Sequence, residues 1–387
     1  MELDGLRRRI DDIDSQIIDL YTQRMGLSRE IAQVKLRTRQ TIYNPRRESD
    51  IVKRAVELSG GQADPVRLTA FYRALMRQSR GLQYEVASER RELDFLCDKP
   101  IRVPVSPQRV ACAGLPGSYT HMAAEHLYPK AEKLFMQTFE EVFGAVADGL
   151  CNCGVLPIDN TTEGSISDVQ EGVVRHHMYL TASVALPVRH CLLAPPGATA
   201  EGLREVYSHP QALGQCAAYL RRLGVLSKAD VNTSVAAERV ARWGDTSKGA
   251  VASHLSAELY GLDILDENIN DEAENTTRFV AVSPVPLVSP DAGRISLSFT
   301  LPHETGSLVN ILSAVSEYGL GLVKVQSVPI PQRPWKYRFY VDVLGNIYSP
   351  KAKALLYMLF CELEDICFLG NYCEETAAEG GEGKDKP

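Results

Sequence analysis

The sequence of 387 residues has no long run of apolar residues, and this absence excludes an ordinary membrane-spanning helix. Its most apolar stretches, such as residues 180–188, are broken by Thr, Ser or Pro well short of the roughly 20 residues that a spanning helix needs. The N-terminus lacks the apolar core and small-residue cleavage site of a secretory signal. We therefore expect a cytoplasmic protein without a membrane partner.

Metal and nucleophile motifs are missing as well. None of the nine cysteines forms a CxxC pair, and Cys151 and Cys153 have no matching second half for a zinc site. The sequence contains no Walker-type phosphate loop and no Ser-His-Asp pattern. These absences predict reduced thiols, no metal and no cofactor.

Charge of one sign is only weakly concentrated. The net charge is −7, yet residues 1–90 hold 17 Lys and Arg against 13 Asp and Glu. This small excess, spread along predicted helices, does not favour a nucleic-acid partner. A small substrate with several negative charges fits it better. Length and ordinary globular composition predict several folded domains.

Residues 1–90 have the apolar spacing of helices. Apolar residues recur three or four positions apart from Leu3 to Val34, which predicts a helix of about 32 residues, ~48 Å long. Two short neighbours cannot cover so long a stripe, so we expect a homodimer or a dimer of dimers. Asn44 and Pro45 mark the start of a second helix that ends at residues 59–61, and Asp64 and Pro65 start a third that ends near residue 90.

Polar residues interrupt the apolar stripe of these helices. Arg24 takes a seam position, and Arg7 and Lys35 flank the seam on one side, 28 residues apart. Ser79 and Gln83 extend the apolar face of the third helix. One such residue alone usually sets helix register. Together they predict an anion pocket suited to a dicarboxylate with an ether or hydroxyl oxygen, lined by Arg7, Arg24, Lys35, Arg47, Glu48 and Gln83.

Residues 1–90 resemble the all-helical chorismate mutase domain of the bifunctional enzymes called P-proteins. The family's active-site positions are matched by Arg7, Arg24, Lys35, Arg47, Glu48, Ser79 and Gln83, and Asn44 stands where the family often has Asp. The resemblance implies a pericyclic rearrangement of chorismate to prephenate. Arginines would clamp the two carboxylates, one of them from the partner subunit, while Lys35 and Gln83 donate to the breaking ether oxygen.

After a Pro-containing linker over residues 91–108, short apolar runs alternate with helical segments across residues 109–284. This order predicts an α/β fold with largely parallel sheets and two lobes that face a cleft. Polar loops follow several predicted strands, at residues 114–120, 157–165, 208–213 and 275–279. Singly each is an ordinary helix cap or turn, but together they indicate one shared site.

These loops resemble those of prephenate dehydratase, whose signature is Thr277-Arg278-Phe279. The resemblance implies that Thr277 donates a proton to the leaving hydroxyl or orients its donor, and that Arg278 balances carboxylate charge. It assigns the positioning of the substrate to Asn160, Ser208 and Gln215, and Asp159 stands where the family usually has Glu. We interpret His209 as ordering its loop rather than as a general acid.

Residues 294–370 follow a βαββαβ order, typical of a small α+β sandwich. This segment resembles an ACT domain, which implies that phenylalanine is the effector, bound at Gly306, Ser307, Leu308, Gln326 and Ser327. The family's Glu-Ser-Arg-Pro is replaced by Gln326-Ser327-Val328-Pro329, so we expect weaker inhibition. Residues 371–387 are rich in Glu, Gly and Lys, and we expect them to be disordered.

The multidomain order of an all-α mutase domain, a two-lobed α/β dehydratase domain and an ACT domain implies a bifunctional enzyme of phenylalanine biosynthesis. Its substrates would be chorismate and prephenate. Two alternatives stay open from the sequence: a dehydratase that prefers arogenate, and a non-enzymatic sensor of aromatic acids. The triplet Thr277-Arg278-Phe279 counts against the sensor.

Overall fold

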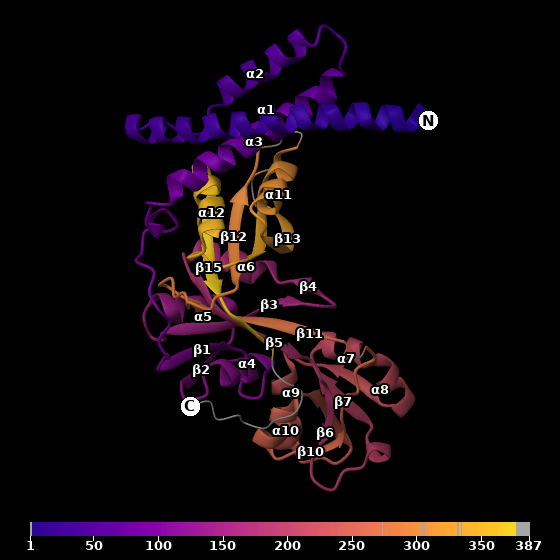
Figure 1. Ribbon diagram of the computed structural model, residues 1–387. Helices are drawn as coiled ribbons and strands as arrows, with labels where there is room; N and C mark the ends of the chain where they lie inside the picture. Colours follow the sequence, from indigo (N-terminus) through magenta and orange to yellow (C-terminus); the bar gives the residue numbers. More distant parts are fainter. Residues whose placement is uncertain are drawn as a thin grey trace. The chain divides into compact units, whose positions relative to one another are not determined.

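The computed structural model describes residues 2–272, 274–302, 304, 306–330, 333 and 335–376, and the chain divides into two compact units. The first unit joins the N-terminal helices to residues 294–368. The second unit contains residues 101–293 and the chain from residue 369 onward. Figure 1 labels the elements of both units.

Three helices form the N-terminal part of the first unit: α1 (Glu2–Thr38), α2 (Pro45–Leu58) and α3 (Pro65–Ser88). The predicted starts of α2 and α3 are confirmed, because the side chains of Asn44 and Asp64 accept the backbone N–H groups three residues ahead. Helix α1 has 37 residues and is longer than predicted. Its apolar stripe from Leu3 to Val34 stays about half exposed.

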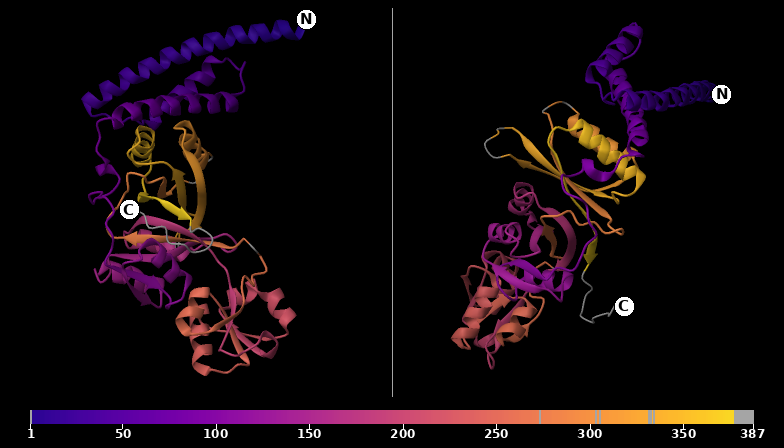
Figure 2. Two further views of the ribbon diagram at one scale, coloured as in Figure 1. Left: turned by 60° about the horizontal axis from the view of Figure 1, so that its bottom comes forward. Right: turned by 90° about the vertical axis from the view of Figure 1, so that its left-hand side faces the viewer.

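Residues 294–370 form the predicted βαββαβ order, which we call the C-terminal module. Its four-stranded sheet has the order β13-β14-β12-β15, and Figure 2 shows both of its helices on the same face of this sheet. The elements are β12 (Arg294–Thr300), α11 (Ser307–Glu317), β13 (Gly321–Pro329), β14 (Tyr337–Leu344), α12 (Pro350–Glu362) and β15 (Ile366–Tyr372). Helix α3 packs against α12, and the Tyr318 hydroxyl donates to the Gly81 carbonyl at 3.0 Å.

The predicted linker over residues 91–108 is partly ordered. A short 3-10 helix, η1 (Leu93–Phe95), places the Phe95 ring 5.2 Å from that of Tyr357 and 5.8 Å from that of Phe360. Leu96 is buried. The first half of this segment therefore packs on α12, and Arg102 forms an isolated bridge with Leu287 further along.

The first lobe of the second unit is built on a sheet with the order β16-β5-β11-β3-β1-β2, with β4 paired to β3. Its strands are β1 (Arg109–Ala113), β2 (Glu132–Met136), β3 (Cys153–Asn160), β4 (Gly164–Ser165), β5 (Tyr179–Pro187), β11 (Thr276–Ser283) and β16 (Glu374–Thr376). Its helices are α4 (Tyr119–Leu127), α5 (Phe139–Ala147) and α6 (Ser167–Arg175).

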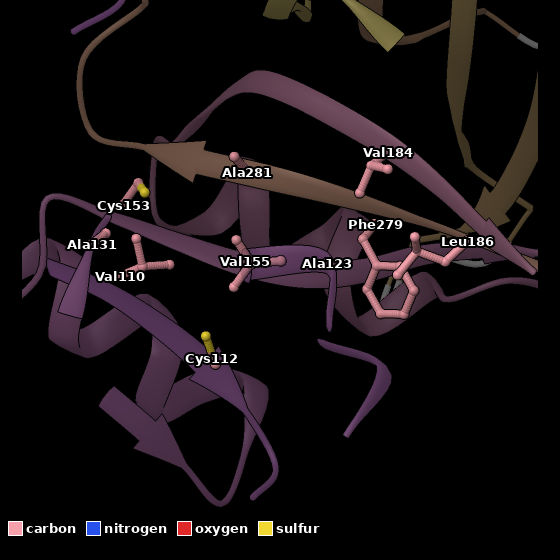
Figure 3. Packing of buried hydrophobic residues seen from close by; sticks show 11 residues of the cluster. Val110, Cys112, Ala123, Ala131, Cys153, Val155, Val184, Leu186, Phe279 and Ala281 are labelled. Atoms are coloured by element: carbon pink, nitrogen blue, oxygen red, sulfur yellow. The ribbon is translucent and has the colours of Figure 1, made fainter. Parts of the chain in front are cut away.

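Side chains that alternate along these strands build a core on each face of the sheet. Val155, Val184 and Phe279 point to the face covered by α4, as Figure 3 shows. On the other face, a Cβ added at Gly154 would lie 2.5 Å from the Val142 side chain of α5. Helices therefore cover both faces, which is the layering predicted for an α/β fold.

The second lobe has a five-stranded sheet of order β10-β6-β9-β7-β8. Its strands are β6 (Cys191–Ala194), β7 (Glu205–Ser208), β8 (Leu226–Ala229), β9 (Lys248–Ala252) and β10 (Asp263–Asp266). Helices α9 (Thr233–Trp243) and α10 (His254–Tyr260) cover one face, and α7 (Pro210–Gln215) and α8 (Ala217–Leu223) cover the other. A 3-10 turn, η2 (Ala200–Gly202), precedes β7.

Two sequence predictions are wrong in this unit. The sheets are mixed rather than largely parallel, because β11 pairs antiparallel with both β3 and β5, and β6 pairs antiparallel with β9 and β10. The predicted disordered tail is also wrong over residues 371–376, where the end of β15 and strand β16 form and β16 pairs parallel with β5. Residues 377–387 lie outside the described residues.

Candidate functional site

The first candidate site lies among α1, α2 and α3. The Arg24 guanidinium donates to the Ser79 hydroxyl and, at 3.3 Å, to the Leu75 carbonyl. Burial lowers the pKa of Arg24, and the Glu48 carboxylate partly opposes this effect. The structure therefore brings together Arg24, Ser79 and Glu48, one from each helix, as the sequence predicted.

Lys35 stands near the end of α1 beside the same carboxylate. Its ammonium donates to the Ile42 carbonyl at 2.6 Å. Burial lowers the pKa of Lys35, the Glu48 charge raises it, and the Arg80 charge lowers it again. A cavity of about 600 Å³ opens beside this side chain and is lined also by Tyr43, Tyr84 and Tyr357.

Gln83 is buried on α3, and its Oε1 atom has no hydrogen-bond partner. The other predicted residues are less enclosed. Asn44 caps α2, and Arg47 in the first turn of that helix is exposed. The Arg7 side chain is 67% exposed, with Asp4 3.5 Å away. A rise of 1.5 Å per residue puts Arg7 about 42 Å along α1 from Lys35, so one chain does not unite them.

Sequence reasoning missed Arg80, which is largely but not fully buried on α3 and ion-paired with Glu48. Its guanidinium also lies 4.7 Å from the centre of the Tyr43 ring. In the sequence, Arg73, Arg77 and Arg80 recur at helical spacing and resemble a solvated stripe. The side chains of Arg77 and Arg80 are similarly enclosed, at 14% and 13% exposed, and no local signal shows which of them pairs with Glu48.

The second candidate site lies where β3 ends and β11 begins. These strands pair antiparallel, and their register sets Asn160 opposite Thr277 and Asp159 opposite Arg278. Residues from two predicted loops, more than 110 positions apart in sequence, thus become direct neighbours. The backbone N–H of Val188 donates to the Asn275 carbonyl at 2.7 Å, which joins the two segments that cross between the lobes.

Hydrogen bonds fix the side chains of this site. The Asn160 Nδ2 amide donates to the Thr277 hydroxyl oxygen at 2.8 Å and to Asn275 Oδ1 at 2.8 Å. Its Oδ1 accepts the Thr162 hydroxyl at 2.6 Å. Asn275 is buried, and its own Nδ2 has no partner. Asn275 begins the polar segment 275–279, and its sequence context gives it no role of its own.

Arg278 and Asp159 form an ion pair beside Thr277. Arg278 Nε donates to Asp159 Oδ2 at 2.9 Å, and the Ser165 hydroxyl donates to Asp159 Oδ1 at 2.5 Å. The shorter carboxylate that replaces the family's Glu is therefore engaged by both Arg278 and Ser165. The guanidinium is consequently neutralised in part before any substrate arrives.

The second lobe holds the remaining predicted residues. Ser208 is completely buried and donates to the Val251 carbonyl at 2.6 Å, so its hydroxyl serves the sheet of that lobe. Gln215 Oε1 lies 3.0 Å from Nε2 of the buried His190. Within the described residues, no hydrogen bond joins Ser208 or Gln215 to Asn160 or Thr277.

Two loops of this region have structural roles. His209 caps α7, since its Nδ1 accepts the Gln211 N–H at 3.3 Å, and this confirms the prediction that it orders its loop. The loop at residues 114–120 docks on α10: a Cβ at Gly117 would lie 2.6 Å from the Ser256 hydroxyl oxygen. The Gly117 N–H donates to His121 Nδ1 at 3.1 Å, so it is not offered to an anion.

The C-terminal module contains a cavity of about 780 Å³. Ser307 and Leu308, two of the predicted effector residues, line it. Gly306 precedes α11 as its N-cap and has a φ of 89°, a conformation natural for glycine. Gln326 and Ser327 lie on β13, one of the two edge strands of the sheet, and do not line this cavity.

None of the described helices combines the length and apolar character needed to cross a membrane. In the described part of the chain, no three His, Cys, Asp or Glu side chains gather as a metal site.

Family models match both enzymatic regions of the chain. The model of type II chorismate mutase matches residues 6–84, and the model of prephenate dehydratase matches residues 110–286. A bifunctional chorismate mutase/prephenate dehydratase of Stutzerimonas stutzeri is 28% identical over 384 residues, which cover 96% of this chain and 97% of that protein. The arogenate dehydratase/prephenate dehydratase 2 of Arabidopsis thaliana is 35% identical, covering 69% of this chain and 73% of that protein.

Two solved structures share the fold of about two thirds of the chain. One is described as GqqA, a novel type of quorum quenching acylase, with 31% identity, a TM-score of 0.63, and coverage of 69% of this chain and 98% of that one. The other is the prephenate dehydratase of Arthrobacter aurescens in complex with L-Phe, with 22% identity, a TM-score of 0.63, and coverage of 68% and 89%. The chain therefore belongs to the prephenate dehydratase family, with a type II chorismate mutase domain preceding its dehydratase domain.

Proposed function

We propose that this chain rearranges chorismate to prephenate among its N-terminal helices and converts prephenate to phenylpyruvate where β3 meets β11. One observation carries the proposal: each site holds a buried amide with an unpartnered atom, Oε1 of Gln83 and Nδ2 of Asn275. Leaving a buried polar atom unpaired costs about 1–3 kcal/mol, and a bound substrate would supply the partner. A cytoplasmic location stays a prediction from the sequence.

The mutase reaction needs only a clamp, because one bond forms and one breaks within a single molecule. Arg24 and Arg47, with Arg7 of a second chain, hold the two carboxylates of chorismate. Lys35 and Gln83 donate to the ether oxygen as its bond breaks. A half-turn of its side-chain amide lets Gln83 present a donor where Oε1 now lies.

The dehydratase reaction expels the ring hydroxyl together with the carboxylate on the opposite carbon of the ring. Asn160 donates to the Thr277 oxygen, which leaves the Thr277 hydrogen free to point toward the substrate. Thr277 passes this proton to the hydroxyl as the C–O bond breaks, so water leaves. The C–C bond to the carboxylate breaks at the same time, its electron pair completes the aromatic ring, and CO₂ leaves. Solvent then reprotonates Thr277.

A preference for arogenate is the second candidate. The Arabidopsis relative, named an arogenate as well as a prephenate dehydratase, is 35% identical, against 28% for the bifunctional bacterial relative. Arogenate differs from prephenate by an amino group in place of the side-chain ketone. The ratio of kcat/KM for the two substrates decides between them.

The proposed function is tested by adding chorismate to the purified chain and following both prephenate and phenylpyruvate. We expect prephenate to rise first and phenylpyruvate to follow. A sensor of aromatic acids would bind these compounds and form neither product. Accumulation of prephenate alone would retain the mutase and overturn the dehydratase.

We propose a homodimer in which two copies of α1 pair, with a dimer of dimers as the larger alternative. The apolar residues of the α1 stripe are 47–65% exposed in one chain, a continuous apolar face that a second copy would cover. Arg7 lies too far along α1 to join Lys35 of its own chain. Pairing of two chains would bring Arg7 of one chain to the site of the other.

Mixing two inactive variants tests this shared site. Arg7→Ala and Lys35→Ala chains are each expected to lack mutase activity, because each removes one cation from every site. Mixed after unfolding and refolding together, they should regain about a quarter of the wild-type activity, because mixed dimers hold one intact site. If a mixture shown to contain mixed dimers regains no mutase activity, sites shared between chains are contradicted. The control is a mixture of Arg9→Ala and Lys35→Ala chains.

We also propose that the C-terminal module is an ACT domain that binds phenylalanine between two copies. Ser307 and Leu308 line its cavity, whereas Gln326 and Ser327 lie apart on the edge strand β13. A second module beside β13 would bring the two groups together. The related dehydratase of Arthrobacter aurescens was solved in complex with L-Phe.

Phenylalanine is expected to bind the module and to inhibit the dehydratase weakly. Val328 stands where the family has arginine, and the lost charge reduces the difference in affinity between two conformations by about 1–3 kcal/mol, the usual size of a coupling energy. Calorimetry and prephenate turnover at millimolar phenylalanine measure both effects. If phenylalanine does not bind and prephenate turnover is unchanged, the module has no role as a phenylalanine sensor. Tyrosine is the matched control ligand.

A further inference from the structure

Arg80 is a buried cation between two carboxylates that come from different parts of the first unit. Its Nη1 group donates to Glu48 on α2, and its Nε group donates to Glu362 on α12 at 2.9 Å. The Arg80 side chain is 13% exposed, and that of Glu362 is 14% exposed. Although burial alone would lower the pKa of Arg80, the two carboxylates together raise it.

Each carboxylate belongs to a second feature of the molecule. Glu48 is the charge that acts on both Arg24 and Lys35 in the mutase site. Glu362 lines the cavity of the C-terminal module that also contains Ser307 and Leu308. Arg80 therefore stands between the mutase site and the C-terminal module.

Docking of the module on α3 has other contacts. Arg77, one turn before Arg80, pairs with Glu317 of α11 at 2.7 Å and donates to Asn310 at 3.3 Å. The Tyr318 hydroxyl bonds Gly81. The Arg77 pair joins the same two parts of the unit but does not reach Glu48, which makes it a matched comparison for Arg80.

We infer that Arg80 is a positioning residue of the mutase site and that Glu362 of the C-terminal module holds it there. The inference rests on the proposed mutase function. An enclosed guanidinium needs carboxylates to pair its charge. Because Glu362 holds the Nε side of the Arg80 guanidinium, its Nη1 group points in one direction, and this direction fixes the position of the Glu48 carboxylate. Glu48 in turn faces the cations that clamp the substrate. The C-terminal module thus supplies a residue on which the geometry of chorismate binding depends.

The test compares two interface variants in the full-length chain. Glu362→Gln keeps size and hydrogen bonding but removes the charge, and we expect kcat for chorismate to fall about tenfold with a smaller change in KM. Arg80→Ala is expected to lower kcat about a hundredfold, and Arg80→Lys to lie between it and the wild type. Glu317→Gln should keep the wild-type kcat, and prephenate turnover should be unchanged in all four variants.

A double variant separates positioning from general loosening. Once Arg80 is absent, Glu362 has nothing to hold, so Arg80→Ala with Glu362→Gln should lose no more activity than Arg80→Ala alone. Losses that add, or equal losses in Glu317→Gln and Glu362→Gln, would show that only docking of the module matters and would overturn the inference. Wild-type kcat in Glu362→Gln would overturn it as well.

The pH profile gives a readout that docking alone does not move. Lys35 offers a positive charge to the breaking ether oxygen only while protonated, so mutase activity falls as pH rises through its pKa. Removing the Arg80 cation raises that pKa, so the alkaline limb should move to higher pH in Arg80→Ala but not in Arg77→Ala. The charged and titratable groups around Lys35 are Glu48, Arg80, Arg39, Tyr43, Tyr84, Arg91, Tyr357 and Cys361.

The wild-type rate with chorismate distinguishes the two levels of failure. A wild-type chain without mutase activity would overturn the proposed function and this inference with it. An active wild type whose Arg80→Ala variant retains both its kcat and its alkaline limb would overturn the inference alone. Melting temperatures of all variants establish that the compared chains are folded.

Discussion

Arg24→Ala is expected to lower mutase kcat/KM by about a thousandfold, because it removes a preorganised cation from a site that works only by holding its substrate. Arg24 is held by Ser79 and the Leu75 carbonyl, so its guanidinium keeps one direction before chorismate binds. Prephenate turnover should stay within about twofold of wild type, because the dehydratase site lies in the other unit. Initial rates with chorismate and with prephenate measure both values.

The control for Arg24 is Arg29→Ala on the same helix, an exposed arginine without an assigned role. It should leave both rates unchanged. Near-normal mutase activity in a folded Arg24→Ala chain would remove Arg24 from the site. Loss of both activities together would point to a folding defect in place of a lost clamp.

Thr277→Ala is expected to lower dehydratase kcat by about a thousandfold, within the 10²–10⁴-fold range of general acid catalysis, while the mutase keeps its rate. The hydroxyl that Asn160 orients is lost, and the second hydroxyl at Asn160, that of Thr162, already donates its hydrogen to Asn160 Oδ1. Thr277→Ser retains the hydroxyl and should recover most of the rate. Phenylpyruvate formation from prephenate is the measurement.

Thr276→Ala is the matched control, since the side chain of Thr276 points to the opposite face of β11. It should leave phenylpyruvate formation nearly unchanged. Normal turnover by folded Thr277→Ala would assign the proton donor to another group. A Thr277→Ser chain as inactive as Thr277→Ala would show that the methyl group matters for packing and not the hydroxyl for chemistry.

Local signals in the sequence predicted the helices well. The start of a helix can be predicted from a few neighbouring residues, because the capping side chain and the first turn are adjacent in sequence. This holds for Asn44 with Pro45 and for Asp64 with Pro65. The βαββαβ order of the C-terminal module also follows from local periodicity. Arg24, Ser79 and Glu48 match family positions in the sequence and lie close together in the structure, and their shared site stays a prediction.

Long-range pairings were beyond reach of the sequence. The antiparallel register that sets Asn160 opposite Thr277 depends on how two strands far apart in sequence pair. The residues of neither strand alone determine this register. Alternating strands and helices predicted parallel sheets, but the chain leaves the first lobe after β5 and returns as β11 in the opposite direction. Arg80 shows the same limit, since its partner Glu362 lies 282 residues away.

Strand β16 has a consequence for where the chain can be cut. Its residues from Glu374 to Thr376 pair parallel with β5, although the C-terminal module separates the two strands in sequence. A dehydratase domain excised at residue 284 would therefore leave β5 as a bare sheet edge, with unpaired N–H and C=O groups that attract other chains. The C-terminal module is thus inserted within the chain of the dehydratase domain rather than following it. A soluble dehydratase fragment needs the C-terminal strand retained or supplied as a separate peptide.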